Sequence, residues 1–452
     1  MSRNNVNRPI KITFLGAGST VFAKTVLGDC MCSEPLKDME IALYDIDATR
    51  LKESKIMLDT LNHNINNGRA KIETYLGPKN RKDALRNAKY VINAVQVGGY
   101  KPSTVIDFEI PKKYGLRQTI ADTLGIGGIF RALRTIPVVL SFAHDMEQVC
   151  PEAWFINYVN PMAMVTGALL LGSKIRTVGI CHSWQGCAYW LLKNLGIKFN
   201  PDKLVWKIAG INHQAWLLEV KEGNKDLYPE VRKRLDKFIS EGRKKGAKKV
   251  DLVRLEIARN FGYYVTESSE HNSEYVPWFI KKTHPELIEQ YGIPLDEYIY
   301  RCISQIKSWK KVSKELLYNK QLTHERSCEY ASYIIESMET NVPFKFGGNV
   351  LNKGLIPNLP ENACVEVPCV SDFNGIQPIY VGNLPEQCAA LNRTNINVQL
   401  LTIQAALTLK KEYIYQAALL DPHTAAELTI DEIRNLCDEL IEAHGDYLPK
   451  YK

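Results

Sequence analysis

Three short groups of residues in this chain have the types and spacing to do chemistry. Gly16 and Gly18 follow an apolar run that starts at Lys11, and glycines in a turn between a strand and a helix let backbone N–H groups approach the phosphates of a dinucleotide. Much further along, Cys181-His182 and Asn212-His213 supply a thiol and two imidazoles. A thiolate and an imidazole at one site suit a divalent first-row metal, with substrate oxygens completing the coordination. We therefore expect an NAD site combined with a metal site.

Other residues extend the expected dinucleotide site. Asp45 ends the second predicted strand, where a carboxylate binds ribose hydroxyls and favours NAD over NADP. The alternative is that Asp45 caps a helix that begins near Ala48. Val21 stands where the full fingerprint has its third glycine, so the motif alone is a weak signal. Gly98, after the fourth strand, permits close approach to the nicotinamide half of the cofactor. The residues expected to bind the cofactor are Gly16, Gly18, Ser19, Thr20, Asp45, Asn93, Gln96 and Gly98.

A carboxylate and an amide stand near the ends of other predicted elements. Asp122 lies beside a glycine-rich loop, and Asn160 precedes Pro161 after the fifth strand. Each has a structural alternative, since Asn before Pro commonly opens a turn. Taken singly, Cys181 and His213 also fit a core cysteine and a satisfied core histidine. Because the carboxyl ends of parallel strands meet at one edge of a sheet, we expect these side chains to line an active site there.

The elements that position these residues follow two patterns. In residues 1–180, strand-like runs alternate with amphipathic stretches at 48–61 and 128–146, which predicts a Rossmann-like, doubly wound parallel sheet. The predicted strands are 10–15, 40–44, 71–75, 90–95, 154–158 and 176–180. In residues 181–452, helical stretches dominate at 287–291, 303–317, 398–419 and 429–444, beside a small antiparallel patch at 362–369 with turn glycines at 375 and 382. We predict an α/β fold of lactate/malate dehydrogenase-like architecture, with an NAD-binding domain over 1–180 and a mainly helical α+β substrate- and metal-binding domain over 181–452.

Composition excludes several classes of protein. The chain has 452 residues, 45% of them hydrophobic and 24% charged, and a net charge of +7, which is ordinary for a globular protein. A basic stretch at 231–249 is interpreted as a solvated helix face and loop, so we expect no nucleic-acid partner. No apolar run reaches the roughly 18 residues that a membrane helix needs, and no membrane partner is expected. The 11 cysteines include no Cys-x-x-Cys pair, and the polar start has no signal-peptide core, so we expect a reducing, cytoplasmic location.

Several segments together resemble glycoside hydrolase family 4, and within it the melibiase-type α-galactosidase branch. The resemblance extends from about residue 11 to residue 451 and is specific in its joint pattern. The segments that carry it are Gly16 to Thr20, Asn157 to Met164, Cys181 to Ser183, Ala209 to His213, Val265 to His271 and Val365 to Pro368. This NAD-dependent family is an exception to the two-carboxylate chemistry of other glycosidases. The resemblance implies a homodimer or homotetramer that hydrolyses terminal α-galactosides.

The resemblance also implies a mechanism and a set of roles. NAD⁺ oxidises the C3 hydroxyl of the sugar, which makes the C2 proton acidic; its loss expels the group at C1, water adds, and the hydride returns to C3. Mn²⁺ stabilises the enediolate as a Lewis acid. Cys181 and His213 match the metal ligands and His182 the proton donor, while Asp122 matches the residue that raises the basicity of the C2 base. The expected substrate-binding residues are Asn160 and Thr104.

One departure from the family pattern concerns the C2 base. Relatives that act on phosphorylated glucosides use a tyrosine, and the corresponding stretch here, 267–275, offers both Glu270 and Tyr275. The arginine that binds the sugar 6-phosphate in those relatives has no clear counterpart, which favours an unphosphorylated galactoside. An α-galacturonidase or α-glucosidase of the same family remains an alternative. So do a net NAD-dependent hydroxy-acid dehydrogenase and a catalytically silent NAD-binding protein.

Overall fold

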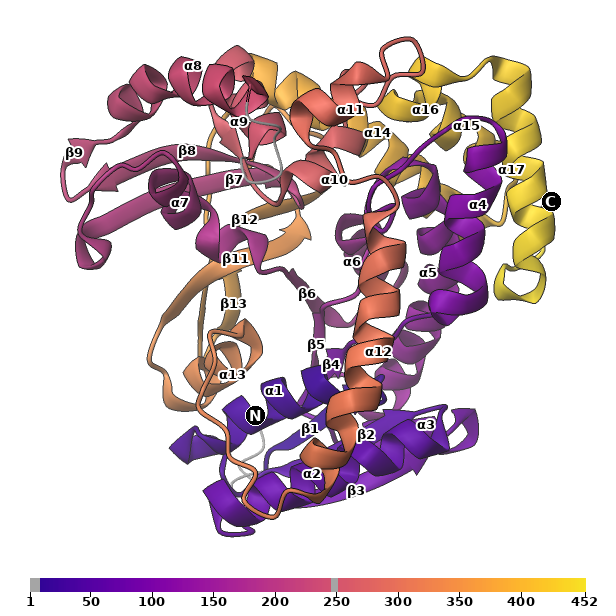
Figure 1. Ribbon diagram of the computed structural model, residues 1–452. Coiled ribbons are helices and arrows are strands. Elements are labelled where there is room, and N and C mark those ends of the chain that lie inside the picture. The colour runs from indigo at the N-terminus through magenta and orange to yellow at the C-terminus, as the bar shows by residue number, and fades with distance from the viewer. Residues whose placement is uncertain (1–8, 245–250) are drawn as a thin grey trace.

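One continuous sheet runs through the protein. The computed structural model describes residues 9–244 and 251–452. Its sheet has 13 strands, in the order β10-β8-β7-β12-β11-β6-β5-β4-β1-β2-β3, with β13 paired to β12 and β9 to β8. Figure 1 shows β4, β5 and β6 between the N-terminal strands and the strands of the second half.

The first six strands are parallel and confirm the predicted doubly wound sheet. They are β1 (Lys11–Leu15), β2 (Glu40–Asp45), β3 (Lys71–Leu76), β4 (Tyr90–Asn93), β5 (Trp154–Asn157) and β6 (Arg176–Ile180). All but the edge strand β3 are buried almost throughout, as strands covered on both faces must be. β4 ends two residues before its predicted end, because its neighbour β1 ends at Leu15, which pairs with Asn93.

Helices cover both faces of this sheet. Those of the first half are α1 (Thr20–Met31), α2 (Ala48–Asn66), α3 (Arg81–Leu85), α4 (Val105–Lys113), α5 (Gly125–Val149) and α6 (Met162–Gly172). Because side chains alternate between the two faces of the sheet, the core has two parts. Ile12 and Phe14 pack with α1 and α2 on one face, and Val91 and Phe155 pack with α5 and α6 on the other. Among the described residues, only α5 is long and apolar enough to cross a membrane, and 83% of its apolar window is buried inside the protein, as in a core helix.

The second half extends the sheet with antiparallel strands. They are β7 (Leu204–Ile211), β8 (Gln214–Glu222), β9 (Lys225–Asp226), β10 (Tyr264–Val265), β11 (Phe344–Leu351), β12 (Cys364–Asp372) and β13 (Gly375–Pro378). β11 joins the two halves, because Gly348 and Asn349 pair with Ile180 and Gly179 of β6. The predicted antiparallel patch is therefore confirmed but larger than expected, since it belongs to the main sheet. β8 was not predicted, because polar residues in the β7–β8 hairpin interrupt the alternation of apolar and polar residues that indicates a strand.

Helices of the second half pack around this extension. They are α7 (Ser183–Asn194), α8 (Tyr228–Lys244), α9 (Leu252–Phe261), α10 (Ser269–Glu274), α11 (Glu286–Tyr291), α12 (Glu297–Tyr318), α13 (Tyr330–Thr340), α14 (Glu386–Thr408), α15 (Glu412–Leu420), α16 (Pro422–Glu427) and α17 (Ile430–His444). The single helix predicted over 398–419 is two helices, because the chain turns at Leu409 with a left-handed φ of 58°. The basic stretch lies partly on α8, with Arg232, Lys233 and Lys237 exposed, and partly in 245–249, outside the described residues.

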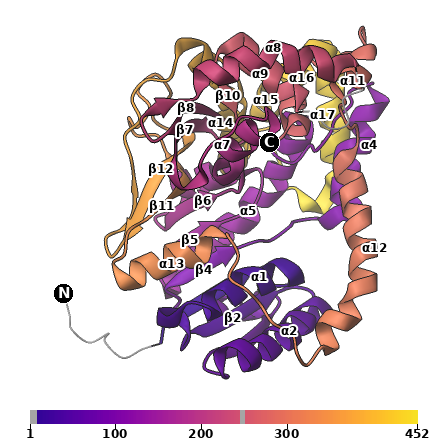
Figure 2. The same ribbon diagram turned by 60° about the vertical axis from the view of Figure 1, so that its left-hand side comes forward.

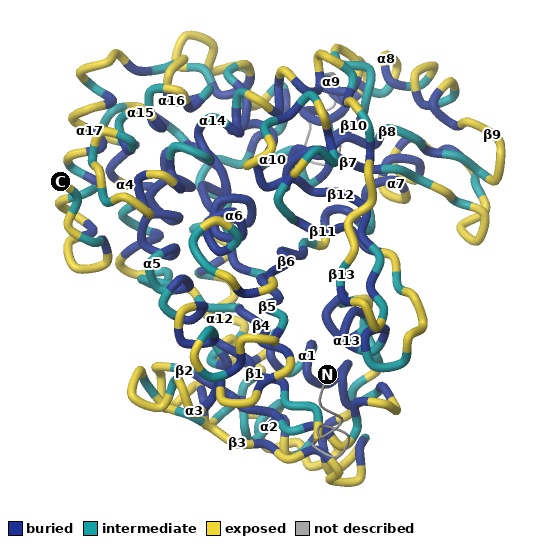
Figure 3. Tube along the Cα trace, turned by 180° about the vertical axis from the view of Figure 1, so that it is seen from behind, coloured by how far each residue is buried: buried dark blue, intermediate teal, exposed yellow. Residues whose placement is uncertain are grey.

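The two halves share their packing as well as their sheet. α14 packs against both α5 and α6, and Figure 3 shows α6 and α14 largely buried. The predicted domain boundary between residues 180 and 181 falls where the last parallel strand, β6, ends. The hydrophobic core continues across this point, and the boundary stays a prediction.

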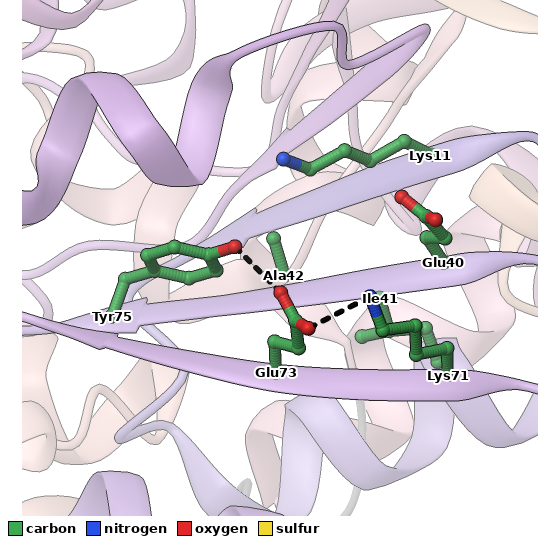
Figure 4. A pocket seen from close by; sticks show the side chains of 7 residues that line it. All are labelled: Lys11, Glu40, Ile41, Ala42, Lys71, Glu73 and Tyr75. Atoms are coloured by element: carbon green, nitrogen blue, oxygen red, sulfur yellow. Dashed lines mark hydrogen bonds and ion pairs between the residues drawn. The ribbon is translucent and has the colours of Figure 1, made fainter.

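A small polar pocket lies at the opposite edge of the sheet from the predicted site. Lys11, Glu40 and Lys71 are the first residues of β1, β2 and β3. Glu73 forms an ion pair with Lys71 and accepts a hydrogen bond from the Tyr75 hydroxyl, at 2.8 Å each (Figure 4). The predicted cofactor residues lie at the carboxyl ends of β1, β2 and β4. Ligands of doubly wound sheets bind at the carboxyl edge, so we assign no ligand to this polar pocket.

Candidate active site

The turn between β1 and α1 is shaped for a phosphate. Gly16 has a φ of +85°, and its N–H and that of Ala17 both donate to the Tyr44 carbonyl at 3.0 Å. A Cβ on Gly16 would lie 2.8 Å from the backbone of Ala94, so only glycine fits there. Ser19 precedes α1 without capping it through its side chain, and no acidic residue occupies the first turn. The N–H groups at the start of α1 are therefore free for an anionic ligand.

Asp45 stands beside this turn, as predicted. One oxygen of its carboxylate accepts the Gly18 N–H at 2.6 Å, and the other accepts the Asp47 N–H at 2.9 Å. The alternative that Asp45 caps the next helix is wrong, because the side chain that caps α2 is Asp47, which accepts from Thr49 and Arg50. The carboxylate at the end of β2 thus lies against the glycine turn, where the ribose of a dinucleotide is held in such folds.

The remaining predicted cofactor residues have different surroundings. Gly98 has a φ of +77° after β4, and Gln96 is exposed. Asn93 is fully buried and donates to the Asn157 side chain at 2.9 Å. The hydroxyl of Thr20 donates to the Gly18 carbonyl at 3.2 Å.

Thr104, which was predicted to bind substrate, lies directly before α4, close to Gly98 and Gly99. It is buried and donates to the Gly99 carbonyl at 3.1 Å. The role of Thr104 in substrate binding stays a prediction.

A second group of residues forms a compact ligand cluster, which we call the metal cluster: Cys181, His213 and Glu267. Their ligand atoms all lie within 4.8 Å of one another. His213 Nε2 is 3.3 Å from Cys181 Sγ and 3.3 Å from a Glu267 oxygen. Sulfur, imidazole and carboxylate make a donor set that fits a divalent first-row metal, and three protein ligands leave coordination positions open for substrate oxygens.

Three separate segments supply these ligands. Cys181 directly follows β6, His213 lies in the tight turn between β7 and β8, and Glu267 follows β10. His213 and Glu267 both have left-handed backbone conformations, with φ of 64° and 68°. Non-glycine residues rarely adopt this conformation, and it is common at functional sites. Glu267 was not predicted as a ligand, although it falls within the segment 265–271 that carries the family resemblance.

The metal cluster favours a positive charge among its side chains. Burial lowers the pKa of His213, but the charges of Glu267 and Cys181 outweigh this effect and raise the pKa to about 10. Burial raises the pKa of Glu267, yet the two imidazoles of His213 and His271 hold it below its usual value. A buried site that attracts a positive charge so strongly is suited to a cation.

Tyr275 contacts the ring nitrogen of His213 that faces away from the other two residues of the metal cluster. Its hydroxyl lies 3.0 Å from His213 Nδ1, while His213 Nε2 faces Cys181 and Glu267. Metal-binding histidines usually hydrogen-bond through their second nitrogen, which fixes the orientation of the ring. Tyr275 is fully buried, and burial raises its pKa well above the usual value. Its contact with the cluster is through the His213 ring.

The other predicted C2 base, Glu270, is not brought to the cluster. Its carboxylate is partly exposed and lies 3.9 Å from Arg301 on α12. The carboxylate of α10 that turns inward is that of Glu274, which accepts the backbone N–H groups of Thr119 and Ala121 at 2.8 Å each. Residues four apart lie on the same face of a helix, so the spacing of Glu270 and Glu274 alone did not decide which carboxylate faces inward.

Asp122 and Asn160 meet, as predicted, and His271 connects them to the metal cluster. Asn160 donates to Asp122 at 3.1 Å, and Thr123 donates to the other carboxylate oxygen at 2.8 Å. His271 stands between two carboxylates, with Nε2 3.7 Å from Asp122 and Nδ1 3.6 Å from Glu267. Burial raises the pKa of Asp122, but the hydrogen bond and charge of His271 hold it well below its usual range. Asp122 is therefore ionised.

His182, the predicted proton donor, follows Cys181 and is half exposed. Its Nε2 contacts the carboxylate of Glu329, which comes from the segment before α13. This hydrogen bond raises the pKa of His182, more than burial lowers it. Glu329 could not be predicted, because it lies 147 residues away along the chain and in no recognised motif.

Comparison with known proteins agrees with this geometry. Residues 11–197 match the family 4 glycosyl hydrolase model, and residues 208–424 match the model of the C-terminal domain of that family. An α-galactosidase of Bacillus subtilis (strain 168) is 61% identical over 98% of this chain and 100% of its own. An α-galactosidase of Rhizobium meliloti (strain 1021) is 34% identical over 98% of this chain and 89% of its own.

A solved structure shows the same fold. It is a 6-phospho-α-glucosidase from gut microorganisms, in complex with NAD and Mn²⁺, with a TM-score of 0.77 at 20% identity over 98% of this chain and 100% of its own. The two family models cover the parallel sheet and its antiparallel extension, and with them all three residues of the metal cluster. This chain therefore belongs to the family 4 glycosyl hydrolases.

Proposed function

We propose that this protein hydrolyses terminal α-D-galactosides, with NAD⁺ and Mn²⁺ as cofactors. The observation that carries the proposal is the metal cluster at the carboxyl edge of the sheet whose first turn is shaped for a dinucleotide. The galactoside is supported by the α-galactosidase that is 61% identical over nearly the whole of both chains. Both cofactors are supported by the family 4 structure in complex with NAD and Mn²⁺.

The residues fit these cofactors by their chemistry. Cys181, His213 and Glu267 would hold Mn²⁺, and the β1–α1 turn with Asp45 would hold NAD⁺. When bound, NAD⁺ would take a hydride from C3 of the sugar and later return it, while Mn²⁺ would polarise the C3 carbonyl.

The protein's own residues would bind the sugar and move its protons. Asn160, held by Asp122, offers its amide to a sugar hydroxyl beside the metal cluster. His182 would give a proton to the glycosidic oxygen as the bond from that oxygen to C1 breaks. Of the two predicted C2 bases, only Tyr275 contacts the metal cluster, through His213 Nδ1.

Hydrolysis of nitrophenyl glycosides tests the proposal. With NAD⁺, Mn²⁺ and a reductant present, we expect α-galactoside to be the preferred substrate over α-glucoside and α-galacturonide, and deuterium at C2 or C3 to slow the reaction. Full activity after removal of NAD⁺ would overturn the mechanism. Preference for galacturonide or glucoside would assign the chain to the alternatives, whose named relatives are 28% and 29% identical. Accumulation of NADH during turnover would indicate a net dehydrogenase.

We also propose that the enzyme works in the cytoplasm as a homodimer or homotetramer. The location is supported by its 11 cysteines, all of which are free thiols. The assembly is supported by the resemblance to the family alone, and light scattering of the purified protein at working concentrations would test it.

A further inference from the structure

One carboxylate near the site comes from a segment that the proposed roles have not used. Residues 319–329 connect α12 to α13, and Figure 2 shows this segment, in orange, passing over α1 on its way to α13. Glu329 ends it and is only 14% exposed in its side chain. Its carboxylate therefore lies inside the protein, beside the end of β6.

Both oxygens of Glu329 have partners in the site. One contacts His182 Nε2, and the other accepts the Tyr158 hydroxyl at 3.3 Å. The Tyr158 oxygen in turn accepts the backbone N–H of Ala331 at 3.3 Å, in the first turn of α13. With two fixed partners, the carboxylate has one orientation, and so does the imidazole that it holds.

A second carboxylate, Asp29 of α1, anchors the segment that carries Glu329. Asp29 is fully buried and accepts the His324 ring at 2.6 Å, the Ser327 N–H at 2.7 Å and the Ser327 hydroxyl at 2.5 Å. The Ser327 hydroxyl oxygen also accepts the Glu329 N–H at 3.2 Å. Asp29 thus holds the backbone of the segment two residues before Glu329, and it does so from the helix that begins at the dinucleotide turn.

We propose that Glu329 is a positioning residue, which orients the imidazole of His182 for proton transfer to the leaving group. This inference rests on the proposed function. Glu329 occupies Nε2, and within the described part of the chain His182 Nδ1 has no hydrogen-bond partner. The proton passes from Nδ1 to the glycosidic oxygen, which keeps the electron pair of the breaking bond to C1. When water later adds its hydroxyl to C1, the other water proton returns to Nδ1.

The dependence on the leaving group distinguishes this role from a structural one. A nitrophenolate leaves readily without a proton, whereas an alkoxide does not. Loss of a correctly oriented acid therefore slows the hydrolysis of alkyl galactosides and not that of nitrophenyl galactosides. For Glu329→Ala we expect kcat/KM on methyl α-galactoside to fall by roughly 100-fold or more, the usual contribution of a positioned acid. On nitrophenyl α-galactoside the fall should be less than about five-fold. Glu329→Gln should lie between the parent and Glu329→Ala, since its amide oxygen still accepts from Nε2. Equal losses on both substrates, or none, would overturn the proposal.

Three controls separate positioning from other effects. Glu336→Gln removes a carboxylate of α13 that pairs with Arg326 outside the site, and it should leave the ratio of the two rates unchanged. Titration of Glu329→Ala with Mn²⁺ and with NAD⁺ should give the parental affinities; a loss of either would overturn the proposal in favour of a structural role. The double variant Glu329→Ala/His182→Asn should lose no more kcat/KM on methyl α-galactoside than His182→Asn alone, because both changes act through one group. Additive losses of kcat/KM would also overturn the proposal.

The same measurements keep the two proposals apart. If the parent prefers a galacturonide or a glucoside, the methyl and nitrophenyl forms of that sugar are compared instead, and only the sugar assignment fails. If the parent hydrolyses α-galactosides but Glu329→Ala shows no dependence on the leaving group, only the role of Glu329 fails.

Discussion

The two ends of this active site use opposite means to bind charge. At the β1–α1 turn, a glycine with a φ of +85° leads into the first N–H groups of α1, which form a site for an anionic ligand, and few side chains take part. At the metal cluster, three side chains from separate segments enclose a site for a cation. The first site depends on close backbone approach, and the second on how distant strands pair. The two should therefore fail independently when mutated.

The largest loss of ligand binding is expected from a change at Cys181. If this change weakened NAD⁺ binding as well as Mn²⁺ binding, the two sites would not be independent. In Cys181→Ser a hydroxyl replaces the soft thiolate ligand. We expect Mn²⁺ affinity to fall by about 100-fold or more and hydrolysis to be nearly lost, with NAD⁺ affinity within about two-fold of the parent. Calorimetric titration with each ligand measures both. Equal Mn²⁺ binding in variant and parent would remove Cys181 from the site.

The reciprocal change is Gly16→Ala. Its Cβ would lie 2.8 Å from the Ala94 backbone, so the turn must move away from β4. We expect NAD⁺ affinity to fall by about 10- to 100-fold, with Mn²⁺ affinity unchanged. Gly68→Ala is the matched control, because Gly68 has a φ of +72° but no atom within 4 Å of the added Cβ. If both variants weaken NAD⁺ binding alike, the effect comes from general strain and not from the turn.

A smaller effect is expected at Tyr275, which sharpens the account of the metal cluster. Tyr275→Phe removes the partner of His213 Nδ1 and leaves the ring itself in place. Loss of such an outer partner typically weakens metal affinity by about 10-fold. NAD⁺ affinity should not change. A much larger loss of kcat at saturating Mn²⁺ would instead indicate that the hydroxyl acts on the substrate.

The smallest effect concerns the junction between the two regions. Glu274 of α10 holds the loop that carries Asp122, and burial raises the pKa of Glu274 to about 7. Between about pH 4.5 and pH 7 the folded protein keeps a proton on this group that the unfolded chain has released, so the stabilisation falls as pH rises through this window.

Glu274→Gln cannot titrate and isolates this contribution. The melting temperature of the parent, measured relative to that of the variant, should fall by about 3 °C between pH 5 and pH 7.5. Calorimetry across this range gives the difference directly. A difference that does not change with pH would contradict the raised pKa.

Particular residues show how far sequence reasoning reached. The six parallel strands, the glycine turn and the meeting of Cys181 with His213 were all predicted. Each follows from local periodicity, from a steric demand that only glycine meets, or from the family resemblance. The caps near Asp45 show the limit of local reasoning, because Asp45 and Asp47 are both suitable residues and only the backbone decides that Asp47 caps α2.

The sequence by itself determined the six parallel strands and the dinucleotide turn before α1, because propensity, alternation and glycine sterics act between near neighbours. Only the tertiary structure decided that Glu267 joins the metal cluster, that Glu270 faces Arg301, and that Glu329 holds His182. These contacts depend on antiparallel pairing in the second half of the sheet and on a segment anchored by Asp29, and both join residues far apart along the chain. Neighbouring residues carry no signal for such pairings, since many side chains of the same type satisfy the same local pattern.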